Sequence, residues 1–249
     1  MIPSRKSPTF TGWFTKQSVK RIRKMFSRVY VRGEDRLRDA AAAGPVLAVS
    51  NHTSWWDPLF AIYTANALGR LDSYAMMDAK NLKRLPFLGR IGGFGFHLDD
   101  PADRRRVLRY AADLLDGPGR LIWIFPEGAE QPRAVGVGAF KPGAAIVAKW
   151  AEIDAVLPIG LRYELLGREQ PEAFISIGEP LKTTDDIELF ALAQAQAVRT
   201  ELETVDDFVL HRNDDAGFSL KLDSRPSRVS VLAERLLSLF TRYPRGEMQ

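Results

Sequence analysis

Short apolar runs alternate with segments of helical periodicity through the middle of this chain. Four runs have the length and composition of buried strands, and they occupy residues 45–50, 121–125, 155–161 and 174–177. Helical patterns separate them at residues 57–68, 100–114 and 143–150. Because such alternation needs crossover helices between neighbouring strands, it predicts an α/β fold with a mainly parallel sheet flanked by helices.

Local signals mark where several of these helices begin and end. Asp57-Pro58 and Asp100-Pro101 are typical helix starts, and Gly69 is a natural stop. A further helical pattern begins after residue 183, and a last one covers residues 229–240. The polar stretch 213–228 between them is typical of a linker. The sequence thus predicts C-terminal helices after the α/β core.

Composition removes several classes of protein. The chain has no cysteine, and its three histidines are too far apart for a local metal motif, so we expect neither a thiol nucleophile nor a metal. No apolar run is long enough to span a bilayer, and the first 25 residues lack the apolar segment of a secretory signal. Residues 136–141 lack the third glycine of a dinucleotide fingerprint, and no phosphate-binding loop motif is present. A cytoplasmic location follows as the default.

Positive charge is concentrated at one end of the chain. Nine of the 35 Lys and Arg residues lie within residues 1–32, which contain no Asp or Glu, so the remainder carries 26 bases and 31 acids. The sequence therefore divides into a basic arm over residues 1–32, an α/β core over residues 33–182 and a helical extension over residues 183–249.

The basic arm has the pattern of an amphipathic helix. Ile22, Met25, Phe26 and Val29 share one helical stripe, and basic residues fill the rest of the circumference. Such a helix suits the surface of an anionic membrane, where each nearby base contributes about 1 kcal/mol. Two alternatives remain open: the stripe packs on the core, or the arm binds nucleic acid. The net acidic core argues against nucleic acid as a partner.

One histidine stands where ligand sites of α/β proteins gather. His52 follows the run at residues 45–50 directly, and Asp57 lies five residues further on. A carboxylate bonded to one ring nitrogen fixes the tautomer and stabilises the imidazolium that forms when the other nitrogen accepts a proton. Asp57 therefore either orients His52 as a general base or only caps the following helix. Neither His97 nor His211 is assigned a role.

Four segments carry a distinctive combination of residues. They are Asn51-His52-Thr53-Ser54-Trp55-Trp56-Asp57, Phe125-Pro126-Glu127-Gly128, Phe140-Lys141-Pro142-Gly143-Ala144 and Val156-Leu157-Pro158-Ile159. In order and spacing they resemble the motifs of the lysophospholipid, or glycerolipid, acyltransferase family, whose members include 1-acylglycerol-3-phosphate acyltransferases. The resemblance covers about residues 31–181, and its first motif is the His-x4-Asp pair.

The resemblance implies a reaction and a location. His52 would deprotonate the hydroxyl of a lysophospholipid-like acceptor while Asp57 holds the imidazole, and the oxygen would attack an acyl-CoA or acyl carrier protein thioester. No acyl-enzyme and no bound cofactor are needed. The residues implied at the substrate site are Phe125, Pro126, Glu127, Gly128 and Lys141. The implied place of action is the cytoplasmic face of the cell membrane, with the protein peripheral or monotopic.

The sequence departs from the family at its phosphate-binding arginines. Ala129 and Glu130 stand where Thr-Arg usually continues the third motif, and residues 93–99 lack the arginine of the second. Arg133 or the run Arg104 to Arg106 could hold an acceptor phosphate from shifted positions. The alternatives are an acceptor without phosphate, such as a glycolipid or another lipid alcohol, and a non-catalytic lipid-binding protein that keeps the fold.

Overall fold

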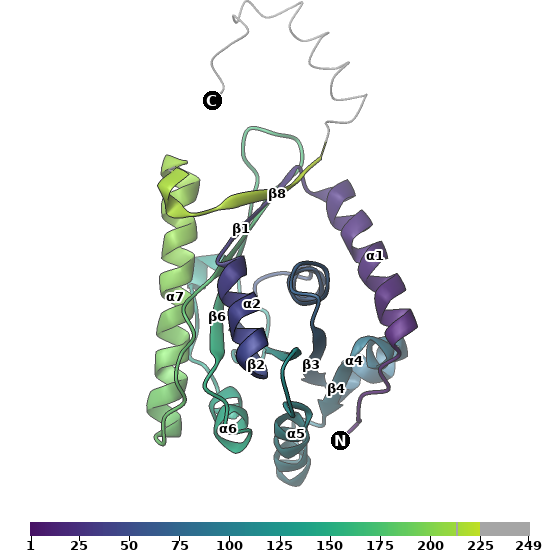
Figure 1. The fold of residues 1–249 in the computed structure, drawn as a ribbon. Coiled ribbons are helices and arrows are strands. Elements are labelled where there is room, and N and C mark those ends of the chain that lie inside the picture. Colours follow the sequence, from purple (N-terminus) through teal and green to yellow (C-terminus); the bar gives the residue numbers. More distant parts are fainter. Residues whose placement is uncertain (213, 225–249) are drawn as a thin grey trace, which may run out of the picture.

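A computed structural model describes residues 1–212 and 214–224. These residues form a mixed sheet of eight strands in the order β4-β3-β5-β2-β6-β7-β1-β8, with helices on both faces (Figure 1). All neighbouring pairs are parallel except β6–β7 and β1–β8. The strands are β1 (Arg28–Arg32), β2 (Val46–Ser50), β3 (Asp72–Asp78), β4 (Gly93–Phe96), β5 (Arg120–Ile124), β6 (Val156–Glu164), β7 (Glu172–Ile177) and β8 (Ser219–Asp223). The predicted α/β class with a mainly parallel sheet is confirmed.

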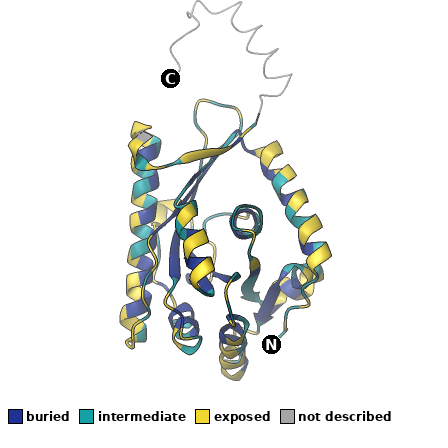
Figure 2. Ribbon diagram, viewed as in Figure 1, coloured by how far each residue is buried: buried dark blue, intermediate teal, exposed yellow. Residues whose placement is uncertain are grey.

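Two apolar layers fill the space between the sheet and its helices. Alternate residues of a strand face opposite sides of a sheet, so Ala48 and Trp123 belong to one layer and Val49 and Ile124 to the other. The central strands are buried on both faces, whereas the helices expose their outer surfaces (Figure 2). This double coverage explains why the central strands read as continuous apolar runs.

The helices divide between the two faces. The first layer contains core residues of α1 (Pro8–Met25), α2 (Glu34–Ala43) and α3 (Asp57–Ile62), and α3 continues as π-helical turns over Tyr63–Leu68. The second contains core residues of α5 (Pro101–Leu114), α6 (Gly143–Trp150) and α7 (Ile187–His211). The helices expected at residues 57–68, 100–114, 143–150 and after residue 183 are all present. No helix in the described part of the chain is both long and apolar enough to cross a bilayer.

The expected amphipathic helix at the N-terminal end is shorter than its pattern indicated. Helix α1 ends at Met25 because the backbone is extended at Phe26, and Val29 lies in β1 beside β7. Ile22, Phe26 and Val29 are almost completely buried, so most of the expected stripe contacts the core. The prediction of one helical stripe over these residues was wrong, because a strand followed the helix where sequence periodicity continued by coincidence. The predicted boundary between arm and core at residue 32 therefore falls at the end of a strand, and residues on both sides of it contribute strands to the same sheet.

The C-terminal part of the chain also joins the sheet. Residues 213–228 were expected to be a linker, but Ser219–Asp223 form β8, which pairs antiparallel with β1. The polar composition misled the prediction because an edge strand exposes most of its side chains. The helix expected at residues 229–240 lies outside the described residues.

Two strands at the other edge carried no clear sequence signal. In β4, two of the four residues are glycines, and a Cβ at Gly95 would lie 2.8 Å from Leu82 of α4 (Ala79–Arg84). Helix α4 therefore packs closely on this strand, and close approach requires glycine there. Strands β2, β3, β4 and β5 are parallel, so their carboxyl ends all lie at the same end of the sheet.

Candidate active site

The loop that carries His52 is anchored to the strand beside it. Asn51, at the end of β2, is buried, and its side-chain amide both donates to and accepts from the backbone of Leu161 in β6, at 2.9 and 2.8 Å. The hydroxyl of Ser50 accepts a bond from the indole N–H of Trp123 at 2.9 Å. These bonds fix the direction in which the chain leaves the sheet, and so fix where His52 points.

His52 and Asp57 are in direct contact. Nδ1 of His52 lies 2.8 Å from Oδ2 of Asp57, and the same carboxylate oxygen accepts the backbone N–H groups of Thr53 and Ser54 at 2.7 and 2.9 Å. Asp57 has no exposed surface. The loop therefore folds around the carboxylate, which is the arrangement required for Asp57 to orient the imidazole.

Asp57 does not act as a helix cap. Trp56 occupies the capping position of α3 without a side-chain cap bond, and Asp57 directs its carboxylate back to the loop that precedes it. Its remaining oxygen, Oδ1, accepts a bond of 2.7 Å from the hydroxyl of Tyr163 in β6. Burial and the neighbouring Asp57 carboxylate raise the pKa of the Tyr163 phenol well above its ordinary value. The phenol therefore stays protonated and donates a hydrogen bond to Asp57.

The hydrogen bonds assign the proton of the neutral imidazole. Because Asp57 is an acceptor, Nδ1 carries the proton and Nε2 is the free base. Within residues 1–212 and 214–224 no protein group bonds to Nε2, and about a fifth of the side chain, 22%, is exposed. The ring stacks on Phe125 with centroids 4.4 Å apart, so one of its faces is covered.

Glu127 connects three segments of the site. It is 8% exposed, and its Oε2 accepts the backbone N–H of His52 at 2.8 Å while its Oε1 accepts that of Gly138 at 2.8 Å. The backbone carbonyl of His52 also accepts a bond from the N–H of Gln131 at 2.8 Å. Glu127 therefore holds the backbone of His52, a positioning role that the sequence did not suggest.

Lys141 crosses the turn that follows Glu127. Gly128 has a φ of +74°, and a Cβ there would lie 2.5 Å from the ammonium nitrogen of Lys141. The backbone N–H of Lys141 donates to Pro126 at 3.0 Å, which ties the two predicted motifs together. No carboxylate of the described residues forms an ion pair with this ammonium group. Phe125 and Glu127 thus contact His52, and Lys141 contacts the Pro126–Gly128 turn next to them.

Arg133 lies on the other side of the His52 loop, among acids. Its guanidinium pairs with Glu164 at 2.8 Å and with Asp206 of α7 at 3.3 Å. It also borders a cavity of about 760 Å³ whose walls include Thr53 and Ser54 but not the imidazole of His52. Its charge is therefore already compensated. The structure does not bring Arg133 together with Gly128 and Lys141 in one cluster of contacts.

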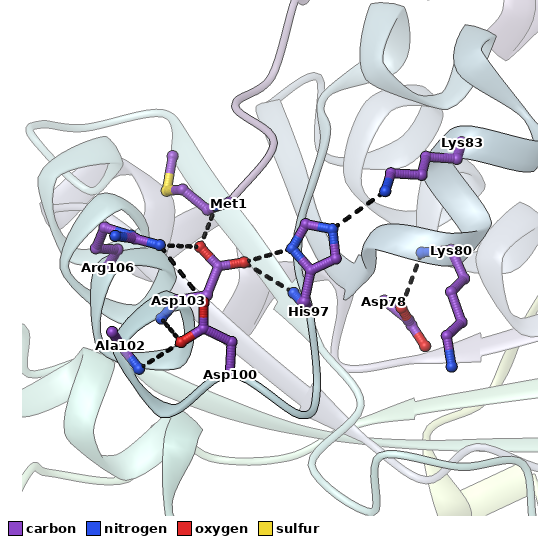
Figure 3. A network of polar contacts seen from close by, with 9 residues as sticks. All are labelled: Met1, Asp78, Lys80, Lys83, His97, Asp100, Ala102, Asp103 and Arg106. Carbon is purple, nitrogen blue, oxygen red and sulfur yellow. Dashed lines mark hydrogen bonds and ion pairs between the residues drawn. The ribbon is translucent and has the colours of Figure 1, made fainter.

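A second imidazole–carboxylate pair lies beyond the carboxyl end of β4. Nδ1 of His97 is 2.8 Å from Oδ2 of Asp103, which also accepts the backbone N–H of His97 at 2.9 Å (Figure 3). The Met1 amino group and the His97 backbone N–H hold the pKa of the Asp103 carboxyl well below its usual range. Nε2 of His97 lies 3.3 Å from the ammonium nitrogen of Lys83. No local sequence pattern connects these residues.

No metal site accompanies either pair, since no three acidic or histidine side chains of the described residues gather closely enough to hold an ion.

Comparison with known proteins matches residues 28–162, which is 135 of the 249 residues, to the model of the family described as Acyltransferase, the lysophospholipid and glycerolipid acyltransferase domain. The match includes His52, Asp57, Glu127 and Lys141. No curated protein matches the chain.

Proposed function

Because the chain belongs to this acyltransferase family and is an acyltransferase, we propose that it moves a fatty acyl chain from a thioester of CoA or acyl carrier protein to a lysophospholipid-like hydroxyl. The contact of 2.8 Å between His52 and the buried Asp57, with no described protein group bonded to Nε2, carries the proposal. A general base needs a fixed tautomer and a ring nitrogen that is free to accept a proton, and the contacts of His52 are consistent with both requirements.

The proposed reaction needs no covalent intermediate on the protein. Nε2 of His52 takes the proton of the acceptor hydroxyl as its oxygen attacks the thioester carbon, and Asp57 stabilises the imidazolium. The carbon–sulfur bond then breaks, and the imidazolium returns the proton to the departing thiolate. Lys141 is the proposed cation for the tetrahedral oxyanion, because it lies beside the Gly128 turn and no carboxylate of the described residues pairs with it. Phe125 and Pro126 form the proposed apolar part of the substrate site.

Acceptor choice has two candidates. A phosphate-bearing acceptor requires either that Arg133 exchanges Glu164 and Asp206 for the phosphate or that the run Arg104 to Arg106 binds it, as expected from the sequence. The existing ion pairs of Arg133 instead favour the second candidate, a lipid alcohol or glycolipid without phosphate beside its hydroxyl. Transfer rates to two acceptors that differ only in that phosphate, measured for wild type and Arg133→Gln, separate the candidates.

We also propose that the protein works at the cytoplasmic face of an anionic membrane. Trp13 and Met25 of α1 are exposed, and exposed Trp55 of the His52 loop lies beside this helix, with the Arg21 guanidinium 5.7 Å from its ring. Exposed tryptophans among basic residues suit the headgroup layer. Trp13→Ala and Trp55→Ala should lower sedimentation with anionic vesicles, whereas Leu210→Ala on α7 should not. Equal binding by all variants contradicts this proposal.

The test of the proposed chemistry is transfer of a labelled acyl chain from acyl-CoA, and separately from acyl carrier protein, to a panel of lipid acceptors by wild type and by His52→Ala. We expect wild type to transfer and the variant to lose about 10²- to 10⁴-fold in rate. An equal rate for a folded variant contradicts the proposal. It favours the alternative that the protein binds lipid without catalysing acyl transfer.

A further inference from the structure

We propose that Arg199 of α7 is a positioning residue for His52. It acts through the loop 131–138, which follows the Pro-Glu-Gly turn and bonds to the backbone of His52 and to Glu127. This role rests on the proposed function, because it concerns the same general base, but the contacts that carry it can be measured without turnover. Arg199 lies beyond the segment that matches the acyltransferase family, so that match assigns it no role.

The loop 131–138 reaches both polar groups of the His52 backbone. At its start, the N–H of Gln131 donates to the carbonyl of His52 at 2.8 Å. At its end, the N–H of Gly138 donates to Oε1 of Glu127 at 2.8 Å, and Oε2 of the same carboxylate accepts the N–H of His52 at 2.8 Å. A displacement of the loop is therefore transmitted to the backbone that carries the imidazole.

Apolar packing does little to hold this loop. None of residues 131–138 is buried, and residues 133–137 line the cavity of about 760 Å³. Val137 is the one residue among them that packs against an apolar layer, and it is only partly buried. A segment with so few buried contacts opens readily unless polar contacts hold it. Hydrogen bonds and ion pairs must therefore fix the position of the loop.

The first half of the loop has an anchor of its own. Arg133 pairs with Glu164 at 2.8 Å and with Asp206 at 3.3 Å. Gly136 follows with a φ of +74°, and glycine adopts either sign of φ at little cost. The chain can change direction at Gly136, so the contacts of Arg133 do not fix the second half of the loop.

Arg199 supplies the anchor of the second half. Its Nε and Nη2 donate to the carbonyl of Val137 at 3.4 and 3.1 Å. This carbonyl and the N–H of Gly138 belong to one planar peptide group, so fixing the oxygen also fixes the direction of the N–H. The guanidinium polarises that peptide, which strengthens the bond from its N–H to Glu127. Val198, next to Arg199 on α7, is fully buried, so the helix is a fixed support for the guanidinium.

Amide hydrogen exchange, followed by NMR, tests this chain of bonds in the full-length protein without substrate. Arg199→Met keeps the apolar part of the side chain and loses its donors. In this variant the Gly138 amide should exchange about tenfold faster than in wild type, and the His52 amide should also exchange faster. Glu203→Gln is the matched control, because Glu203 lies one turn further along α7 and lines the same cavity but makes no hydrogen bond to the loop. Wild-type exchange at both amides in Arg199→Met overturns the inference.

Steady-state kinetics test the effect on the base. Arg199→Met should lower kcat about tenfold with the KM values for donor and acceptor unchanged, and Arg199→Lys, which keeps one charged donor, should recover part of the loss. Glu203→Gln should keep the wild-type kcat. Added to Glu127→Gln, Arg199→Met should cause no further loss, because both changes break one chain of bonds.

Three kinetic outcomes overturn the positioning role. They are a wild-type kcat in Arg199→Met, a raised KM with no change in kcat, and losses that multiply when Arg199→Met and Glu127→Gln are combined. A wild type that transfers no acyl chain to any acceptor overturns the proposed function instead, and the exchange rates of the Gly138 and His52 amides still test the contacts of Arg199.

Discussion

The two imidazole–carboxylate pairs at this edge of the sheet have the same internal contact but different surroundings. Each joins Nδ1 to a carboxylate oxygen at 2.8 Å, and each carboxylate is buried. The side chain of His52 is 22% exposed and its Nε2 has no partner among the described residues, whereas the side chain of His97 is 48% exposed and its Nε2 lies 3.3 Å from the ammonium nitrogen of Lys83. The pair alone therefore does not define a base.

The difference teaches which contacts distinguish the roles. Around Asp57, two loop N–H groups and the Tyr163 hydroxyl point at the carboxylate, so the whole loop is shaped for one ring orientation. Around Asp103 the further donors are the His97 backbone N–H and two cations, Arg106 and the Met1 amino group. The first pair thus has the arrangement that the proposed base requires, whereas the second gathers cations around its carboxylate.

The largest expected effect compares the same substitution at both pairs. Asp57→Asn should lower kcat about 10²- to 10⁴-fold, because an amide can hold the imidazole in the wrong tautomer. Asp103→Asn should lower kcat far less, because its imidazole partner is not the proposed base. Rates measured with acyl-CoA at saturation check both. A loss in kcat at Asp103 as great as that at Asp57 would remove the distinction between the pairs.

Glu127→Gln tests a contact that only the first pair has. The amide presents N–H groups to one of two backbone donors, so either His52 or Gly138 loses its acceptor. We expect a fall in kcat of about ten- to a hundredfold as the imidazole shifts, and a loss of about 1–3 kcal/mol in the free energy of unfolding. Unchanged rates in a protein with wild-type urea unfolding would show that Glu127 does not position His52.

Tyr163→Phe sharpens the same comparison at smaller scale. The variant removes the phenol that donates to Oδ1 of Asp57 and keeps the ring that packs on Phe26 and Phe60. We expect a loss of about 1.5–3 kcal/mol in unfolding free energy and a fall in kcat smaller than that of Asp57→Asn. Urea unfolding and initial rates measure the two effects. A kcat as low as that of Asp57→Asn would make the phenol an equal member of the catalytic unit.

The smallest expected effect concerns acid stability. The pKa of Asp103 is lowered in the folded protein, so its ionisation contributes stability that is present above the unfolded carboxyl pKa of about 4 and is lost as the pH falls below it. Asp103→Asn should therefore flatten the dependence of unfolding free energy on pH between neutral pH and about pH 3. Urea unfolding at several pH values measures the slope. An unchanged slope would show that Asp103 gains nothing from its cationic partners.

The sequence could predict the part of the site that depends on local order. His52 and Asp57 lie on one loop, and the Pro-Glu-Gly turn follows a central strand, so spacing and strand topology place them. Tyr163 lies 106 residues from Asp57 in sequence, and only the pairing of β2 with β6 brings them together. No local pattern marks such a contact. Glu127 was predicted as a site residue, but its hydrogen bonds to the backbone of His52 and Gly138 could not be predicted from the sequence.

The fold was predictable where strands are buried on both faces and less so at the edges. Central β2 and β5 read as apolar runs, while glycine-rich β4 and exposed β8 did not. The second pair depends on β4, so it was missed for the same reason. At the other end of the chain, α1 passes into β1 without a break in apolar spacing, and sequence periodicity alone could not locate the boundary.

The most direct test of the central claim is a double-mutant cycle on kcat with His52→Ala and Asp57→Asn. If Asp57 acts only through the imidazole, the double variant should be no slower than His52→Ala alone, because the two residues work as one unit. Independent contributions would instead multiply, and a double variant slower than His52→Ala by the full factor of Asp57→Asn would contradict the account.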